Sequence, residues 1–222
     1  MNVAENIKKL HEIVPRDVKI VAVSKFHPAS MILEAYEAGQ RAFGESRVQE
    51  FLLKEKELPS DINWHFIGHL QTNKVKQIIG KTHLIESVDS ERLLDLIDRE
   101  SEKAGVVTNV LLQVHVADEE TKFGFFPQEI KSYFSQRSFE SLRATHICGI
   151  MGMATNTDDE EKVRNDFHTL QEIFLEIKND PALGLRGFDI LSMGMSGDWK
   201  LAVEEGSNMV RIGSAIFGER SY

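Results

Sequence analysis

The chain has 222 residues, of which 41% are hydrophobic and 27% are charged, a composition typical of a globular protein. Its single cysteine, Cys148, excludes a disulfide within the chain and favours a reducing compartment. The net charge of −9 argues against a nucleic-acid partner, and we find no signal peptide and no apolar run of membrane-spanning length. We therefore expect a cytoplasmic protein without a nucleic-acid or membrane partner.

Short apolar runs alternate with amphipathic segments along the whole chain. A leading helix is predicted, with Asn2 as its cap and Glu5 three residues later. Strands with helical segments between them are then predicted at 19–25, 41–44, 63–68, 83–88, 110–115, 146–151, 188–193 and 209–213. Ser46 with Gln49 predicts a capping box for the helix after the second strand.

This strand-helix rhythm predicts an α/β fold, namely a closed (β/α)₈ TIM barrel that forms a single domain over 1–222 with an extra amino-terminal helix. The helix after the sixth strand has a predicted capping box at Thr157 and Glu160. An open doubly wound sheet is the alternative, but the first strand is not followed by a Gly-rich dinucleotide fingerprint. In a barrel, functional residues lie at the carboxyl ends of the strands.

Lys25 stands at the carboxyl end of the first predicted strand, just before Pro28, where a helix can begin. Partial burial at a barrel mouth lowers the pKa of a lysine amine and leaves some of it neutral, so that it can attack a carbonyl carbon. The alternative is a lysine that ends a strand and points into water. On this stretch alone, the alternative would be favoured.

The loops after the seventh and eighth strands favour the functional interpretation. The segment Ser192 to Gly197 leads into a helix start, where free N–H groups attract an anion. The segment Arg211 to Gly218 contains small residues and a hydroxyl that allow close approach of a phosphate. Such residues also make ordinary tight turns, but barrels often bind phosphate at these two loops. Together the loops predict a phosphate site.

Strands one and eight are neighbours in a closed barrel, so Lys25 and Arg211 are expected to face one mouth. An amine beside a phosphate site suits a ligand with an aldehyde and a phosphate, and pyridoxal 5′-phosphate (PLP) is the obvious candidate. Arg211 as the partner of the pyridine nitrogen would keep that nitrogen unprotonated, because a guanidinium retains its charge.

Five ordered motifs, at 22–25, 43–50, 64–74, 191–196 and 210–218, resemble the pyridoxal phosphate homeostasis protein family over nearly the whole chain. The resemblance implies the fold type III barrel of the alanine racemase amino-terminal type, with PLP bound as an internal aldimine on Lys25. It also implies an Arg211 contact to the pyridine nitrogen. The other cofactor-binding residues that it implies are Ser46, Ser192, Met195, Ser196, Gly213 and Ser214, four of which (Ser192, Ser196, Gly213 and Ser214) would hold the phosphate.

Two residues depart from the family pattern, in which asparagine usually stands where this chain has Ser46 and His115. The first departure puts a side-chain contact from Ser46 to the cofactor in doubt, and the second could change the polarity or pH response of the mouth. The charges at 118–122 are most simply interpreted as a solvated loop. Lys122 resembles a family lysine on that loop, and the alternative is a secondary role in receiving or releasing cofactor.

Other polar residues have simpler interpretations. His65 and His69 are four residues apart, but Gly68 breaks the helix that would align them, so a metal site is not expected. His65 is expected to point into the barrel with a hydrogen-bond partner. Cys148, in the middle of a strand, is expected to pack rather than react.

Three functions fit these residues. The first is a non-catalytic, monomeric PLP carrier in vitamin B6 homeostasis, with apo PLP-dependent enzymes as acceptors. The second is a racemase-like PLP enzyme, which needs an acid/base group on each face of its substrate. The third is a Schiff-base aldolase that uses Lys25 without a cofactor. The family resemblance favours the carrier.

Overall fold

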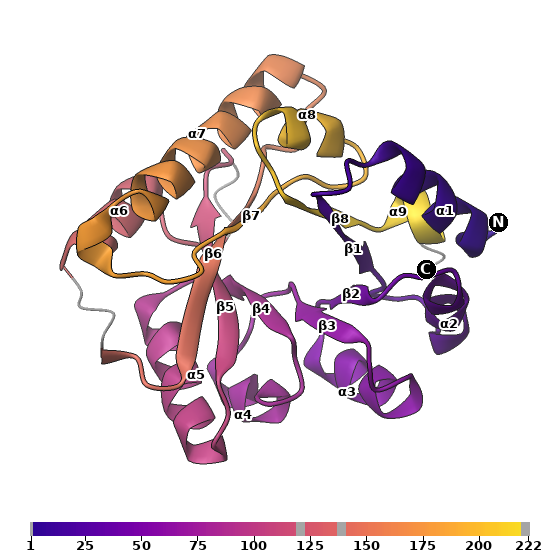
Figure 1. Ribbon diagram of the computed structural model, residues 1–222, viewed down its shortest axis with the longest axis horizontal. Coiled ribbons are helices and arrows are strands. Elements are labelled where there is room, and N and C mark those ends of the chain that lie inside the picture. Colours follow the sequence, from indigo (N-terminus) through magenta and orange to yellow (C-terminus); the bar gives the residue numbers. More distant parts are fainter. Residues whose placement is uncertain (1, 119–122, 137–140, 219–222) are drawn as a thin grey trace.

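Eight parallel strands close into a barrel in the computed structural model, which describes residues 2–118, 123–136 and 141–218 (Figure 1). Each strand pairs with the next, and β8 pairs with β1 so that Val21 lies opposite Arg211. The predicted TIM barrel is therefore confirmed. The strands are β1 (Lys19–Val23), β2 (Ala42–Glu45), β3 (Asn63–Phe66), β4 (Leu84–Val88), β5 (Thr108–His115), β6 (Thr145–Met153), β7 (Ile190–Ser192) and β8 (Met209–Ile212).

The helices cover the outside of the ring of strands (Figure 1). They are α1 (Val3–Ile13), α2 (Ala29–Glu37), α3 (Val48–Glu57), α4 (Val75–Ile78), α5 (Glu91–Ala104), α6 (Pro127–Gln136), α7 (Glu160–Lys178), α8 (Trp199–Glu204) and α9 (Ser214–Phe217), with short 3₁₀ turns η1 (Thr72–Lys74) and η3 (Pro181–Leu183). The extra amino-terminal helix is confirmed as α1, whose Asn6 side chain donates a hydrogen bond to the carbonyl of Ile216 at 3.0 Å. The last helix, α9, was not predicted.

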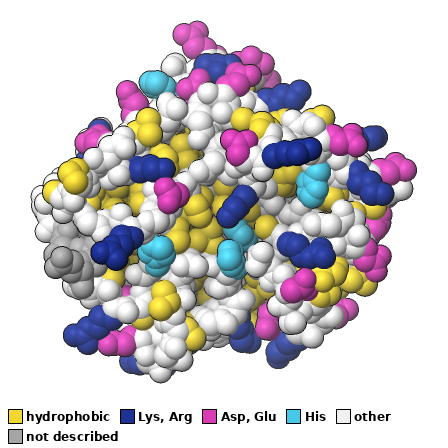
Figure 2. Space-filling view, viewed as in Figure 1, with side chains coloured by type: hydrophobic (Ala, Val, Ile, Leu, Met, Phe, Trp, Pro, Cys, Tyr) yellow, Lys and Arg dark blue, Asp and Glu magenta, His cyan; other side chains and the backbone are white. Residues whose placement is uncertain are grey.

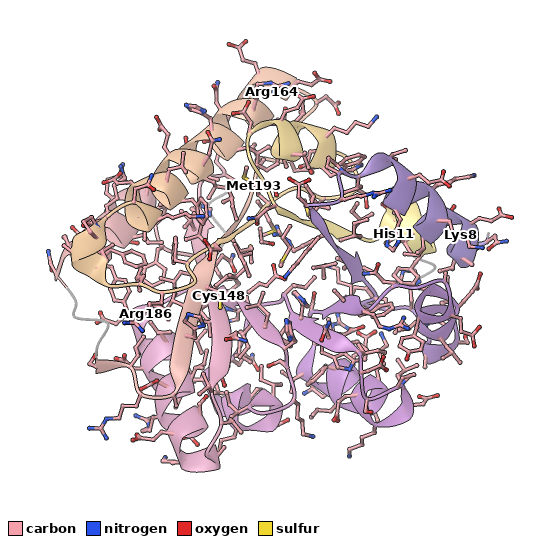
Figure 3. The ribbon with its side chains drawn as sticks, viewed as in Figure 1. Lys8, His11, Cys148, Arg164, Arg186 and Met193 are labelled. Carbon is pink, nitrogen blue, oxygen red and sulfur yellow. The ribbon has the colours of Figure 1, made fainter. Side chains whose placement is uncertain are left out.

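Apolar side chains form two cores. The larger one lies between strands and helices and includes fully buried Phe43, Phe51 and Phe167. The smaller one includes Val21. It also includes Cys148, which is labelled in Figure 3. Cys148 packs in this core as expected, and burial raises the pKa of its thiol.

Acidic and basic side chains alternate around the rim of the face shown in Figure 2, and hydrophobic side chains gather in its hollowed centre. This distribution is typical of barrel helices that turn a polar side to water. Among the described residues, no helix combines the length and the hydropathy that crossing a bilayer requires.

The helix caps differ in part from prediction. The Asn2 cap is confirmed, because its Oδ1 accepts a hydrogen bond from the Glu5 N–H at 3.0 Å. The predicted capping box at Ser46 is wrong, because Arg47 is the residue that precedes α3. Ser46 instead follows directly after β2 and lies at the barrel mouth. Gly68 packs so closely on Ser46 that an added Cβ would lie 2.2 Å from its carbonyl oxygen.

The predicted cap of α7 by Thr157 is also wrong. The Asp159 carboxylate caps this helix, accepting hydrogen bonds from the N–H groups of Glu161 and Lys162 at 3.1 and 3.3 Å. A carboxylate benefits from the positive end of the helix dipole, which explains why it takes the cap position from a hydroxyl two residues earlier.

Candidate functional site

A cavity of about 550 Å³ opens at the carboxyl ends of β1, β2 and β8 and beside the loop after β7. All the predicted site residues except Ser192 line it: Lys25, Ser46, Met195, Ser196, Arg211, Gly213 and Ser214. The fold thus brings residues that are up to 189 positions apart to one mouth, because the barrel closes between β1 and β8.

Lys25 lies in a turn rather than at the end of the strand as predicted, since β1 stops at Val23. The N–H of the buried Ser24 still donates to the carbonyl of Gly44 at 3.0 Å, so the backbone follows the sheet up to the residue before the lysine. The N–H of His27 donates to the Ser24 carbonyl at 3.1 Å and closes the turn. The half-buried Lys25 side chain therefore starts from an ordered edge of the sheet.

The loops after β7 and β8 meet at the cavity, as the two-loop prediction requires. The Ser196 hydroxyl accepts a hydrogen bond from the N–H of Gly213 at 3.1 Å and a longer one from Ala215 at 3.5 Å. The approach of the first loop depends on Gly194, which has φ +94° and would bring an added Cβ within 2.5 Å of the Ala202 side chain. The hydrogen of the Ser196 hydroxyl is not used in these two contacts, so it can be donated to an anion at the point where the loops meet.

The Arg211 side chain extends from β8 across the barrel interior toward β7 and β6, and it lines the cavity. It is 4% exposed, and its Nη1 donates to the carbonyl and hydroxyl oxygens of Ser192 at 2.9 and 2.7 Å, while its Nη2 donates to the Gly152 carbonyl at 2.8 Å. Burial lowers the pKa of Arg211, and the nearby carboxylates of Glu86 and Asp198 oppose that shift. A guanidinium keeps its charge in such a setting.

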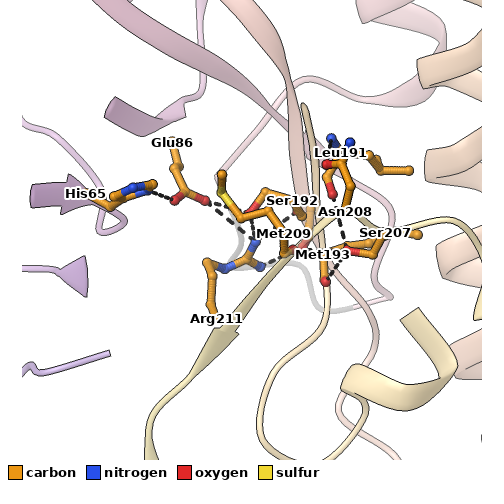
Figure 4. A network of polar contacts seen from close by, with 10 residues as sticks. His65, Glu86, Leu191, Ser192, Met193, Ser207, Asn208, Met209 and Arg211 are labelled. Atoms are coloured by element: carbon orange, nitrogen blue, oxygen red, sulfur yellow. Dashed lines mark hydrogen bonds and ion pairs between the residues drawn. The ribbon is translucent and has the colours of Figure 1, made fainter. Parts of the chain in front are cut away.

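A buried network of polar side chains, with the carboxylate of Glu86 at its centre, supports Arg211 within the barrel (Figure 4). Glu86 Oε2 lies 3.8 Å from Arg211 Nη1 and accepts a hydrogen bond from the Ser192 hydroxyl at 2.7 Å, while its Oε1 lies 2.6 Å from Nδ1 of His65. Burial alone would raise the pKa of Glu86, but the His65 hydrogen bond and charge, the Arg211 charge and the Ser192 hydroxyl together lower it. Glu86 is thus an ionised counter-charge within the barrel.

These contacts place Ser192 outside the cavity lining. It is fully buried, and its hydroxyl joins Glu86 to Arg211. Its position therefore suits orientation of Arg211 rather than the direct phosphate contact that the family resemblance implied. Sequence reasoning did not assign Glu86 a role, although a carboxylate within a mainly apolar strand was a visible signal.

The two histidines near β3 have separate partners. His65 points inward to Glu86, as expected, whereas the Nδ1 of His69 lies 2.8 Å from Asp89 and its ring stacks on Phe123 with centroids 3.7 Å apart. In the described part of the chain, no group of three His, Cys, Asp or Glu side chains could hold a metal ion.

The two departures from the family pattern lie at different places relative to the cavity. His115 is buried outside the cavity lining, with its ring edge against Phe126 at 5.2 Å, so this departure from the family pattern does not alter the cavity wall. Ser46 does line the cavity, so the other departure lies at the site itself. Lys122 lies outside the described residues.

Comparison with known proteins finds relatives that align with nearly the whole of this chain. Residues 1–221 match the family model for the alanine racemase N-terminal domain. A pyridoxal phosphate homeostasis protein of Aquifex aeolicus is 41% identical over 99% of this chain and 96% of its own length. A mouse protein of the same name is 38% identical over 100% of this chain and 82% of its own length.

Solved structures also resemble this chain over nearly its whole length. The PipY protein of Synechococcus elongatus with PLP bound has a TM-score of 0.86 and 36% identity, covering 97% of this chain and all of that chain. An alanine racemase from Streptomyces lavendulae has a TM-score of 0.82 at 16% identity and covers 98% of this chain but 56% of that one. At such low identity, the racemase comparison shows a shared fold alone.

Proposed function

Because this chain belongs to the pyridoxal phosphate homeostasis protein family, we propose that it binds PLP covalently at Lys25 and holds it for delivery to acceptor enzymes. The observation that carries the proposal is the cavity that Lys25 shares with Arg211 and the loops after β7 and β8. A relative at 36% identity has a structure with PLP bound. We propose that the protein acts as a monomer in the cytoplasm, with apo PLP-dependent enzymes as acceptors.

The residues at the cavity fit this cofactor. The cofactor's aldehyde reacts with amines, and Lys25 is the amine at the cavity that would hold it covalently. The hydroxyls of Ser196 and Ser214 can donate hydrogen bonds to a phosphate, because the Ser196 oxygen accepts from Gly213 and Ala215 and its own hydrogen remains for another acceptor.

Arg211 would face the pyridine nitrogen as a fixed cation. Its hydrogen bonds to the carbonyls of Ser192 and Gly152 and to the Ser192 hydroxyl hold the guanidinium in place. Glu86 balances its charge from inside the barrel. A guanidinium does not give up a proton to a pyridine, so this contact would leave the cofactor's nitrogen neutral and weaken it as an electron sink. That property suits storage better than catalysis.

The alternative function is racemisation of an amino acid on the same barrel, which the shared fold with alanine racemases favours. Racemisation needs a proton donor and acceptor on each face of the substrate. Lys25 could serve one face. We propose a carrier because the relatives that cover most of this chain are named for pyridoxal phosphate homeostasis.

The carrier predicts two outcomes for the PLP-loaded protein. It should restore the activity of an apo PLP-dependent enzyme mixed with it, and it should not exchange the α-proton of alanine for solvent deuterium at an enzymatic rate. NMR of the α-proton in heavy water, with Lys25→Ala as the control, measures the second outcome directly. Rapid exchange that depends on Lys25 would replace the carrier with the racemase-like enzyme.

A further inference from the structure

The backbone beside Lys25 is strained. Phe26 has φ +69°, and among the described residues it is the only one other than glycine with a positive φ. This left-handed conformation costs a bulky L-residue on the order of 1–3 kcal/mol, so it persists only where the surroundings enforce it. The side chain of Phe26 is 43% exposed, and burial of that ring does not explain the conformation.

Two charged side chains hold the backbone on both sides of the lysine. The Nζ of Lys54 donates to the carbonyl oxygen of Ser24 at 2.9 Å, and Oε1 of Glu50 accepts from the N–H of Phe26 at 2.6 Å. Lys54 and Glu50 are themselves paired at 2.7 Å, four residues apart on α3. The residues before and after Lys25 are therefore tied to a single ion pair.

This ion pair extends to Glu45 at the end of β2. Oε1 of Glu45 accepts from Lys54 Nζ at 2.8 Å and from the Ser24 hydroxyl at 2.6 Å. Lys54 is 6% exposed and Glu45 is fully buried. An ammonium group has three donors, and here they reach Ser24, Glu45 and Glu50. Burying a lysine and its carboxylate partners costs desolvation free energy, so this ion-pair cluster is weak as a source of stability and a functional role would explain it.

We propose that Glu45, Glu50 and Lys54 form a positioning cluster that fixes the strained turn and aims the Lys25 side chain into the cavity. Packing alone does not require a cluster here, since an apolar side chain at position 54 would fill the same space without burying charge. What the cluster adds is a fixed direction for the turn. This inference rests on the proposed role of Lys25, and the cluster residues act through that lysine without touching the cofactor.

Glu50→Ala is the sharpest test, because Glu50 is the cluster member with 21% of its side chain exposed and its loss should spare the fold. We expect covalent attachment of PLP, measured by its absorbance and by borohydride reduction, to weaken about tenfold. Binding of pyridoxine 5′-phosphate, which has no aldehyde, should remain near the wild-type value because the phosphate loops are unchanged. A variant that merely loosens the fold would weaken both.

Four variants serve as comparisons. Glu55→Ala removes another α3 glutamate with a lysine partner, Lys81 at 3.6 Å, and should leave PLP attachment unchanged. Glu50→Gln keeps an oxygen that can accept from the Phe26 N–H and should recover part of the attachment. Lys54→Met, compared with Lys56→Met at an exposed position of the same helix, tests the other arm of the cluster.

Hydrogen exchange of the Phe26 amide provides a readout without cofactor. In the apo protein, Glu50→Ala should speed exchange of this amide while Glu55→Ala does not. Faster exchange with wild-type PLP attachment would overturn the positioning role, and so would unchanged exchange. If the wild-type protein itself does not attach PLP to Lys25, the proposed function fails instead, a result that the amide measurement distinguishes.

Discussion

Replacing Lys25 with alanine is expected to abolish covalent attachment of PLP and leave the fold intact. Lys25 is half-buried at a cavity and lies outside both apolar cores, so its truncation removes no core contact. Ser196, Gly213 and Ser214 are untouched, and weak non-covalent binding through the phosphate should remain. Borohydride treatment followed by mass spectrometry of the digested protein measures the attachment.

The control for this experiment is Lys74→Ala, which removes a half-buried lysine of the η1 turn. This variant should keep the yellow absorbance of bound PLP and the reduced adduct on Lys25. An adduct of undiminished yield in Lys25→Ala would show that another lysine is the attachment point, with Lys74 and Lys122 the first to examine.

The order of elements in this fold follows from local patterns. The strands are short segments with a mainly buried pattern and each long helix has an apolar stripe, so the barrel could be predicted without knowledge of any contact. The ends of the strands and helices were predicted less accurately than their order. The run from 19 to 25 looks continuous, yet β1 stops at Val23, because its last residues turn under the control of side chains on α3.

The site could be predicted as far as it depends on strand order. Lys25 and Arg211 face one cavity because β1 and β8 close the ring. The network behind them could not be predicted, since it joins residues such as His65, Glu86 and Ser192 through the barrel interior. No spacing rule reports which buried side chains of separate strands point at one another.

Arg211→Glu is expected to destabilise the protein itself, rather than only to change the cofactor's spectrum. The new carboxylate would be buried near Glu86, and the carbonyls of Ser192 and Gly152 would lose their donors. Removing one partner of a buried ion pair costs about 3–5 kcal/mol, a large part of the 5–15 kcal/mol that typically stabilises a folded domain. Urea unfolding near neutral pH measures the loss.

The pH dependence of this loss has a definite sign. In the wild type, the pKa of Glu86 is lowered below the ordinary 4.5, so its contribution to stability is present above that pH and is lost as the pH falls through the folded-state pKa. In Arg211→Glu, two buried carboxyls repel, so their folded-state pKa values rise. The protonated, uncharged form of these carboxyls is the one that favours folding, and it is present at low pH and lost as the pH rises. The stability difference between the two proteins should therefore shrink as the pH approaches 4.5 from neutrality.

The double variant Arg211→Gln with Glu86→Gln separates charge from shape at this position. It removes both charges and leaves side chains that can still donate and accept hydrogen bonds toward Ser192. Its stability should recover most of what Arg211→Glu loses, and it should vary less with pH than either the wild type or the single variant. If Arg211→Glu is as stable as the wild type near neutral pH, the carboxylate at position 211 must reach water, and Arg211 cannot be the buried cation that faces the pyridine nitrogen. In that event the spectrum of bound PLP should also be unchanged by the substitution.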